Sequence, residues 1–241
     1  MPTIRRIIKF SGVGIHSGDN VEMTLKPLGK KHEILFKRTD IPDDQQNTVT
    51  ARCGSVCDTS MRNTTIGKRD GTNIKTIEHL MAALFMAGID SVLIEINGPE
   101  VPIMDGSARE FYDKISKAGK TNGFLKQIVV RKTIEVRADS ILKKMPWWKR
   151  IWVRFTNLFT GRRFDGFVRI SPSDDIAMHI KATLDYPNKI IGRQTYCYDF
   201  VPGSGSVADF VENIARARTF GRYDEWEKLK KNGYGAWCKR K

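Results

Sequence analysis

The chain has 241 residues, of which 40% are hydrophobic, and 41 Lys and Arg against 27 Asp and Glu give a formal net charge of +14. This length and composition are typical of a globular protein with one large or two ordinary domains, and no apolar run approaches the roughly 18 residues of a membrane-spanning helix. The excess of positive charge favours an anionic partner such as nucleic acid, a nucleotide or an anionic membrane surface.

The chain carries no sign of export. Its N-terminus, MPTIRRIIKFSGVG, lacks the apolar core and small-residue cleavage site of a signal peptide. The four cysteines have neither CxxC spacing nor the density of a disulfide-rich protein, so we expect free thiols. Both observations predict a cytoplasmic protein.

Short strands and two helices are expected in the first half. Alternation of apolar and polar residues predicts strands at 21–26, 34–38 and 91–96. The stretch TIEHLMAALFMAGID repeats apolar residues every three or four positions, which predicts a helix with Thr76 at its N-cap and Gly88 at its end. SAREFYDKISKAG predicts a second helix, which begins after a serine cap and ends at a glycine.

A polar link near residue 122 predicts a boundary between domains at 1–121 and 122–241. The second half begins again with strands, in FLKQIVVRKTIEVR, FVRISP and AMHIKATLDY, and a helix is expected from Val207. The order of strands followed by a helix therefore occurs twice, which indicates a mixed architecture of strands and helices.

Glu78 and His79 stand side by side at the head of the first predicted helix. In a structural interpretation, the carboxylate complements the helix dipole and the histidine makes a hydrogen bond. In a catalytic interpretation, the two side chains leave the helix about 100° apart. One can then ligate zinc while the other reaches the metal-bound water. The catalytic interpretation requires two further protein ligands.

Four stretches occur in a characteristic order: SGVGIHSGDN (11–20), KTIEHLMAAL (75–84), GIDSVLIEINGPEVPIMDGSAREF (88–111) and ARARTFG (215–221). Together they closely resemble the UDP-3-O-acyl-N-acetylglucosamine deacetylases, zinc amidases that commit lipid A (lipopolysaccharide) synthesis in Gram-negative bacteria. The resemblance implies an α+β fold of two small sandwich domains, each a sheet with two helices, packed helix to helix. It also implies removal of acetate from UDP-3-O-acyl-N-acetylglucosamine by zinc-activated water.

The resemblance assigns roles to four residues. By the matching motif, His79 is expected to ligate zinc and Glu78 to act as the base that activates the water. ARARTFG supplies Thr219, which in the family steadies the tetrahedral oxyanion, and Phe220, which lines the sugar site. An oxyanion donor of this kind stabilises a transition state by several kcal/mol.

Three further residues have two interpretations each. His16, in the glycine-flanked GVGIHSG, contacts substrate or is simply a histidine in a turn. Met61 matches an apolar residue beside the family's substrate, and its alternative is a core methionine. Asp105, in IMDGS, is expected to shape the turn before the second helix through its own side-chain hydrogen bonds rather than to take part in chemistry.

The sequence departs from the family pattern in the remaining zinc ligands. The family has them in a later His-Lys-x-x-x-Asp motif, which none of the four histidines (His16, His32, His79 and His179) begins. One of three expected Zn²⁺ ligands is therefore present, and the second domain is expected to be incomplete. The chain is interpreted as a C-terminally truncated member: a frameshifted product, a fragment or a non-catalytic relative, whose own activity stays open.

Residues at about 141–165 form a basic, aromatic insertion relative to the family, with seven Lys and Arg and no acid from 141 to 163. Pro146 is suited to open a helix there. The aromatic stripe and the cations beside it include Trp148, Trp152, Phe155, Lys149 and Arg150. This pattern is typical of a helix lying on an anionic membrane, and the alternative is a stripe packed on the protein's own core.

Three functions of different kinds therefore compete. The first is the zinc deacetylase, or a remnant of one, and the second is a non-catalytic protein that binds the inner-membrane surface through the insertion. The third, nucleic-acid binding, has only the net charge in its favour and lacks a recognisable binding motif, so no nucleic-acid partner is expected.

Overall fold

The computed structural model describes residues 1–29, 31–43, 46–58, 63–68, 71–126, 128–143, 145–151, 153, 166–186, 190–201 and 206–220. The chain forms two compact units, of which the first combines Met1–Lys126 with residues from Ala208 onward and the second is Gln127–Val207. The first unit is thus discontinuous in sequence. The domain ranges 1–121 and 122–241 stay predictions.

A mixed five-stranded sheet forms the centre of the first unit. Its strands are β1 (Ile8–Val13), β2 (Asn20–Pro27), β3 (Ile34–Arg38), β4 (Thr48–Thr50) and β8 (Val92–Ile96). They lie in the order β1-β2-β8-β3-β4, and all neighbours are antiparallel except β3 and β8, which run parallel. The strands predicted at 21–26, 34–38 and 91–96 are confirmed as β2, β3 and β8.

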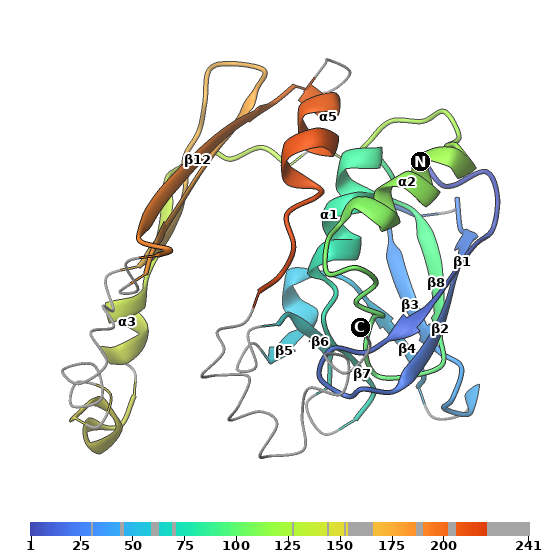
Figure 1. Cartoon of the computed structure of the whole chain (residues 1–241), viewed down its shortest axis with the longest axis horizontal. Helices are drawn as coiled ribbons and strands as arrows, with labels where there is room; N and C mark the ends of the chain where they lie inside the picture. The colour runs from blue at the N-terminus through green and yellow to red at the C-terminus, as the bar shows by residue number, and fades with distance from the viewer. Residues whose placement is uncertain are drawn as a thin grey trace. The chain divides into compact units, whose positions relative to one another are not determined.

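Two helices lie together against this sheet (Figure 1). They are α1 (Glu78–Ala87) and α2 (Arg109–Ala118), and each is ten residues long. A small second sheet in the same unit joins β5 (Val56–Asp58), β6 (Thr65–Gly67) and β7 (Asn73–Ile74), after a short 3₁₀ turn, η2 (Cys53–Ser55). The predicted α+β class is confirmed.

The core is a continuous apolar layer between the sheet and the helices. Leu25 of β2 pairs with Ile94 of β8, and Ile94 pairs in turn with Phe36 of β3. All three side chains are fully buried, as are Leu80 in α1 and Phe111 in α2. Each such side chain contributes about 1.5–3 kcal/mol through removal of its apolar surface from water.

Glycines end both helices, as predicted. Gly88 follows α1 with φ +69°, a left-handed conformation that glycine adopts without steric cost, and its N–H donates to the carbonyls of Leu84 and Phe85. Gly119 follows α2 with φ +71°. At the start of α2, the Ser107 hydroxyl accepts a hydrogen bond from the Arg109 N–H at 3.1 Å, one residue before the N-cap position at Ala108.

The prediction that Thr76 is the N-cap of α1 was wrong. The N-cap is Ile77, which makes no side-chain capping bond, and Thr76 lies outside the helix with φ +60°. A β-branched residue rarely adopts this conformation, which costs on the order of 1–3 kcal/mol. The hydroxyl of Thr76 donates instead to the buried carboxylate of Glu100, 2.8 Å away.

The described strands of the second unit form two separate pairs. They are β9 (Ile134–Arg137) with β10 (Phe167–Ile170), and β11 (Met178–Asp185) with β12 (Arg193–Phe200), both antiparallel. A short helix, α3 (Ala138–Lys143), follows β9. After β12 the chain forms α5 (Ser206–Asp209) and the π-helical turn η3 (Phe210–Ile214), where a helix was predicted from Val207. No helix among the described residues is long and apolar enough to cross a membrane.

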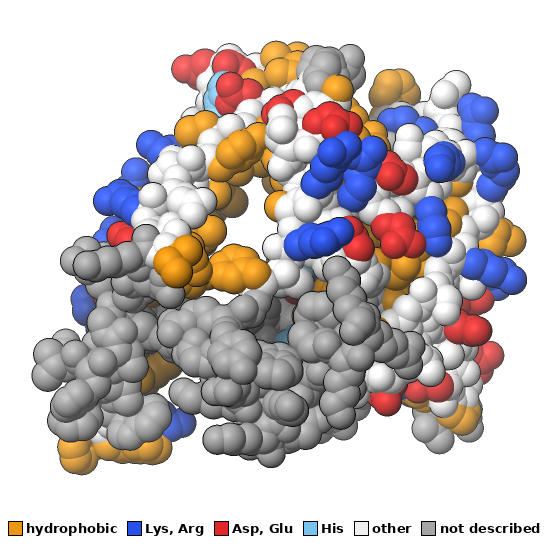
Figure 2. Space-filling model, viewed as in Figure 1, with side chains coloured by type: hydrophobic (Ala, Val, Ile, Leu, Met, Phe, Trp, Pro, Cys, Tyr) orange, Lys and Arg blue, Asp and Glu red, His pale blue; other side chains and the backbone are white. Residues whose placement is uncertain are grey.

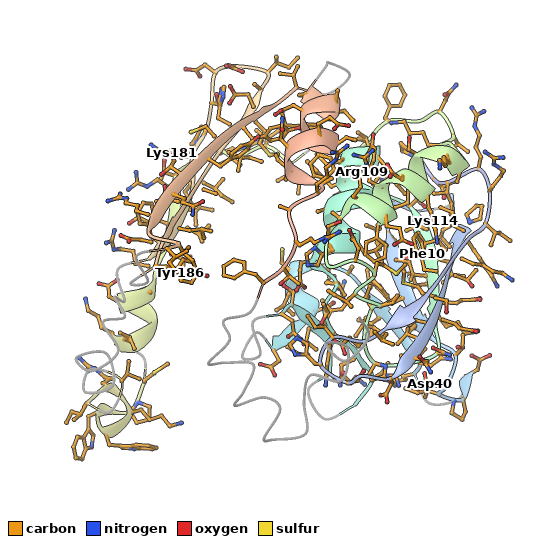
Figure 3. All side chains as sticks on the ribbon, in the orientation of Figure 1. Phe10, Asp40, Arg109, Lys114, Lys181 and Tyr186 are labelled. Atoms are coloured by element: carbon orange, nitrogen blue, oxygen red, sulfur yellow. The ribbon has the colours of Figure 1, made fainter. Side chains whose placement is uncertain are left out.

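The core assignment can be tested with two phenylalanines. Phe111, 1% exposed, packs on Phe10 with 5.1 Å between ring centroids, and the Lys114 ammonium lies 4.8 Å above the Phe10 ring (Figure 3). Phe111→Ala should lower the free energy of unfolding by about 3–5 kcal/mol. Phe124→Ala, at a ring that is 92% exposed, should change it by less than about 0.5 kcal/mol. Urea titrations followed by NMR signals of the five-stranded sheet would check both, and equal losses would contradict the assignment.

Candidate functional site

Glu78 and His79 are the first two residues of α1, and both side chains are half-buried. Because the first N–H groups of a helix lack intrahelical acceptors, this end is electropositive and favours a carboxylate. The Glu78 carboxylate also accepts a hydrogen bond from the Thr64 N–H at 3.1 Å. The chain therefore holds this carboxylate in place at the same helix end that carries the imidazole of His79.

His16 lies in a tight turn whose backbone is hydrogen-bonded to a buried carboxylate. Backbone hydrogen bonds from Gly14 to Asp19 and from Gly18 back to Gly14 close the turn. The N–H groups of His16 and Ser17 both donate to the carboxylate of Glu100, at 2.9–3.2 Å. The backbone of His16 is thus fixed, while its side chain is half-buried.

Thr219 and Phe220 lie in the segment after η3, which packs on the start of α2. The Thr219 N–H donates to the Gly106 carbonyl at 2.7 Å, and a Cβ added to Gly106 would lie 3.6 Å from the Thr219 methyl group. Gly106 has φ +87°, so a glycine suits this turn. The side chains of Thr219 and Phe220 remain exposed.

Arg109, at the first position of α2, joins η3, which immediately precedes this segment, to the helix (Figure 3). Its guanidinium donates to the carbonyl of Val211 at 3.0 Å and to the carboxylate of Asp113 at 2.9 Å, and it lies 3.5 Å from Glu212. Acidic and basic side chains accordingly lie close together over α2 and the segment that follows α5 (Figure 2). The neighbouring carboxylates raise the pKa of Arg109 further above its usual value, with Asp113 as the main cause.

Asp105 shapes the turn before α2, as predicted. Its carboxylate accepts hydrogen bonds from the N–H and the hydroxyl of Ser107, at 3.0 and 2.7 Å, and lies 3.5 Å from the Arg218 guanidinium. Partial burial opposes ionisation, but the bonds from Ser107 and the charge of Arg218 outweigh it and hold the pKa of Asp105 below its usual value. Asp105 therefore links the turn to the residue before Thr219.

Several predicted site residues lie outside the described residues, namely Met61, Trp152 and Phe155. In the insertion, residues 147–151 are helical directly after Pro146, where a helix was predicted. Trp148 is 56% exposed, and the Lys149 ammonium lies 5.2 Å from the centre of its ring. Arg150 is half-buried.

Other histidines in the described residues already have carboxylate partners. His32 lies 2.7 Å from Asp90, and His179 is held between Asp175 and Asp199, which raise its pKa, with Asp199 as the main cause. Within the described part of the chain, no three His, Cys, Asp or Glu side chains form a group that could hold a metal ion. The described residues include His79, the predicted ligand, but do not by themselves fit a catalytic zinc, which normally has three protein ligands.

Two residues of this region were missed by the sequence analysis. Glu100 sits in an otherwise apolar run, PEVPI, and a lone acid in such a run is the signal that could have marked it as buried. Arg109 was read only as part of the second helix. Its role depends on residues about a hundred positions later, for which periodicity gives no signal.

Comparison with known proteins gives a consistent result. The family model described as UDP-3-O-acyl N-acetylglycosamine deacetylase matches residues 1–238. A UDP-3-O-acyl-N-acetylglucosamine deacetylase from Myxococcus xanthus is 36% identical over 233 residues, which cover 96% of this chain and 63% of the relative. Proteins of the same name from Nitratiruptor sp. and Neisseria meningitidis are 35% and 33% identical, over 96% and 97% of this chain and 65% and 66% of their own lengths. The chain thus spans just under two thirds of the length of these relatives.

The lowered pKa of Asp105 predicts an acid-sensitive attachment of the Thr219 segment. A carboxylate with a lowered pKa in the folded state contributes stability that is present above its unfolded pKa and is lost as pH falls through the folded value. Asp105→Asn should therefore lower the free energy of unfolding of the first unit by the same amount at all pH values above about 5. The difference in this free energy between the variant and the unmodified chain should shrink below about pH 4. Urea titrations between pH 3 and 7, followed by NMR signals of α2, would show this. A difference independent of pH would contradict the assigned role.

Proposed function

This chain belongs to the UDP-3-O-acyl-N-acetylglucosamine deacetylase family, and we propose that it takes part in the reaction after which the family is named. In that reaction the acetyl group leaves the amide nitrogen of UDP-3-O-acyl-N-acetylglucosamine as acetate, which commits the sugar to lipid A synthesis. The observation that carries the proposal is the family match over residues 1–238, which includes Glu78 and His79 at the start of α1.

Glu78 is proposed as the general base. A base must be held within hydrogen-bonding reach of the proton it accepts, and the Thr64 N–H fixes the Glu78 carboxylate at a helix end that favours negative charge. His79 is proposed as one ligand of a zinc ion, which would activate water and polarise the amide carbonyl if it were bound. Further ligands would come from outside the described residues.

Thr219 and Phe220 are proposed to face the substrate. The backbone bond from Thr219 to Gly106 fixes its main chain and leaves the hydroxyl on an exposed side chain, where it can donate to the oxyanion of the tetrahedral intermediate. The ring of Phe220 is 55% exposed and offers an apolar surface to the sugar. His16, whose loop is fixed by Glu100, is proposed to contact the substrate, as is Met61, which lies outside the described residues.

The first experiment measures zinc binding and acetate release by the same purified chain. We expect about one zinc per chain after gel filtration in metal-free buffer, and His79→Ala should weaken zinc binding at least tenfold because a ligand is lost. With UDP-3-O-acyl-N-acetylglucosamine and zinc, acetate release should fall by about 10²–10⁴-fold in Glu78→Gln, because the variant lacks the base.

The matched control is His32→Ala, since His32 is a second histidine of the first unit and is paired with Asp90. It should leave both zinc binding and acetate release unchanged. Zinc retained by His79→Ala would refute the proposed ligand. Zinc bound through His79 without acetate release would refute catalysis by this chain and leave a metal-binding, non-catalytic member of the family.

A second proposed function is binding to an anionic membrane surface, for which the exposed aromatic residues of the insertion give a specific reason. Trp147, Trp148 and Ile151 are each more than half exposed on a helical segment that also carries Lys149. Aromatic rings at the boundary of the acyl chains and cations at the headgroups are the pattern of an interfacial helix. A lipid-bearing substrate makes such a location chemically sensible, and the chain would then associate peripherally with the inner membrane.

Vesicles of phosphatidylglycerol and phosphatidylcholine would test the membrane proposal. Trp148→Ala should weaken binding of the chain by about tenfold, equivalent to the loss of roughly 1.5 kcal/mol of apolar burial. The matched control is Phe167→Ala, because Phe167 is 54% exposed and also lies beside cations, Arg137 and Arg169, but belongs to β10. Equal effects of the two substitutions, or no binding by the unmodified chain, would contradict the proposal.

A further inference from the structure

Glu100 is a fully buried carboxylate to which neither the family resemblance nor the proposed chemistry gives a role. Its side chain has no exposed surface, although a buried charge is strongly unfavourable unless it is paired or well hydrogen-bonded. Among the described residues, no Lys, Arg or His forms an ion pair with it. Hydrogen bonds alone compensate this charge, and their donors come from two segments far apart in the sequence.

The first segment is the turn that carries His16. The Ser17 N–H donates to one carboxylate oxygen of Glu100 at 2.9 Å, and the His16 N–H lies 3.1 and 3.2 Å from the two oxygens. A Cβ added to Gly14 would lie 2.4 Å from Glu100 Oε2, so only glycine leaves space for the carboxylate here. The turn is therefore shaped around Glu100.

The second segment is the entry to α1. The Thr76 hydroxyl donates to Glu100 Oε1 at 2.8 Å, which helps hold Thr76 in its left-handed conformation. The main chains of the two segments are also paired, because the Lys75 N–H donates to the carbonyl of Pro99 at 2.8 Å and the Val101 N–H donates to the carbonyl of Lys75 at 3.0 Å. Glu100 is thus anchored directly beside the turn that leads into the helix.

Two further hydrogen bonds lead from Thr76 toward the Glu78 carboxylate. The Asn63 side-chain amide donates to the Thr76 hydroxyl oxygen at 3.4 Å, and the next residue, Thr64, donates its N–H to Glu78. Glu100 contacts neither Glu78 nor His79 through any described hydrogen bond. Among side-chain hydrogen bonds of the described residues, the path from Glu100 to Glu78 runs through Thr76 and Asn63, beside the backbone pairing of Lys75 with Pro99 and Val101.

We propose that Glu100 is a positioning residue that locks the His16 turn to the strained Thr76 entry of α1 and thereby sets the direction in which Glu78 and His79 leave the helix. The inference rests on the proposed function in so far as Glu78 and His79 form the site. The mechanical link from Glu100 to the Glu78 carboxylate does not depend on the chemistry. A substitution at Glu100 should accordingly change the amide exchange of Thr64, although Glu100 makes no hydrogen bond to Thr64.

The test compares Glu100→Gln with the unmodified chain by amide hydrogen exchange and by zinc affinity. A glutamine can keep an oxygen toward Ser17, but its NH₂ group then faces the Thr76 hydroxyl, which must reverse from donor to acceptor. We expect faster exchange of the Thr64 N–H, by about tenfold or more, and zinc binding about 10–100-fold weaker, the usual effect of removing a group that orients a ligand.

Two substitutions at Thr76 isolate the contribution of its hydroxyl group. Thr76→Val removes the donor at nearly constant shape and should reproduce both effects of Glu100→Gln, whereas Thr76→Ser keeps the hydroxyl and should restore behaviour close to that of the unmodified chain. Ile115→Val in α2 is the stability control, because it removes a buried methyl group from the core. It should leave Thr64 exchange and zinc affinity unchanged.

The outcomes separate the inference from the function on which it rests. Faster exchange at His16 and Ser17 alone, with Thr64 unaffected, would overturn the inference and leave Glu100 as a local support of the turn. Thr64 exchange that responds to Glu100→Gln in a chain that binds no zinc through His79 would uphold the positioning link and refute the proposed metal site instead. Equal responses from Ile115→Val would also overturn the inference, since general destabilisation would then explain them.

Discussion

Parallel pairing of β3 with β8 requires the chain to return to the starting end of β3 before it enters β8. It does so through β4, which pairs antiparallel with β3, and then passes through β5, β6, β7 and α1 before Val92. Parallel neighbours cannot be joined by a tight hairpin, and the crossover usually contains a helix that packs on the sheet. The apolar side of α1 is buried in the core against the sheet. This packing fixes the place of the beginning of the helix, with Glu78 and His79.

Hydrogen bonds to two acidic residues fix the turns next to the beginnings of α1 and α2. Glu100 fixes the turn of His16 beside the entry to α1, and Asp105 fixes the turn that leads into α2. Arg109 attaches η3 to the start of α2, and in the segment after η3 the Thr219 N–H donates to the Gly106 carbonyl. Charged and polar groups here define geometry, whereas the apolar layer between sheet and helices supplies most of the stabilisation.

The sequence alone was sufficient to predict those elements whose residue pattern reflects burial on one face. β2, β3 and β8 alternate apolar and polar residues, and Gly88 and Gly119 mark helix ends because both positions have a positive φ. β1 was not predicted, since Ser11 and Gly12 interrupt its alternation, and β12 was not predicted either. Thr76 was misassigned because its hydroxyl bonds a residue 24 positions away rather than the helix that follows. Long-range partners of this kind leave no local signal, which is also why Arg109 was missed.

The discontinuity of the first unit has a consequence for how the chain folds as it is made. Residues up to Lys126 leave the ribosome well before Ala208, and the whole second unit must be translated in between. At roughly 5–20 residues per second, the interval lasts several seconds, far longer than the time in which a hairpin or a helix forms. During this time the sheet and both helices can form, but Arg109 and Gly106 have no segment to bind. The start of α2 therefore stays uncovered in the nascent chain until the residues from Ala208 onward have been made.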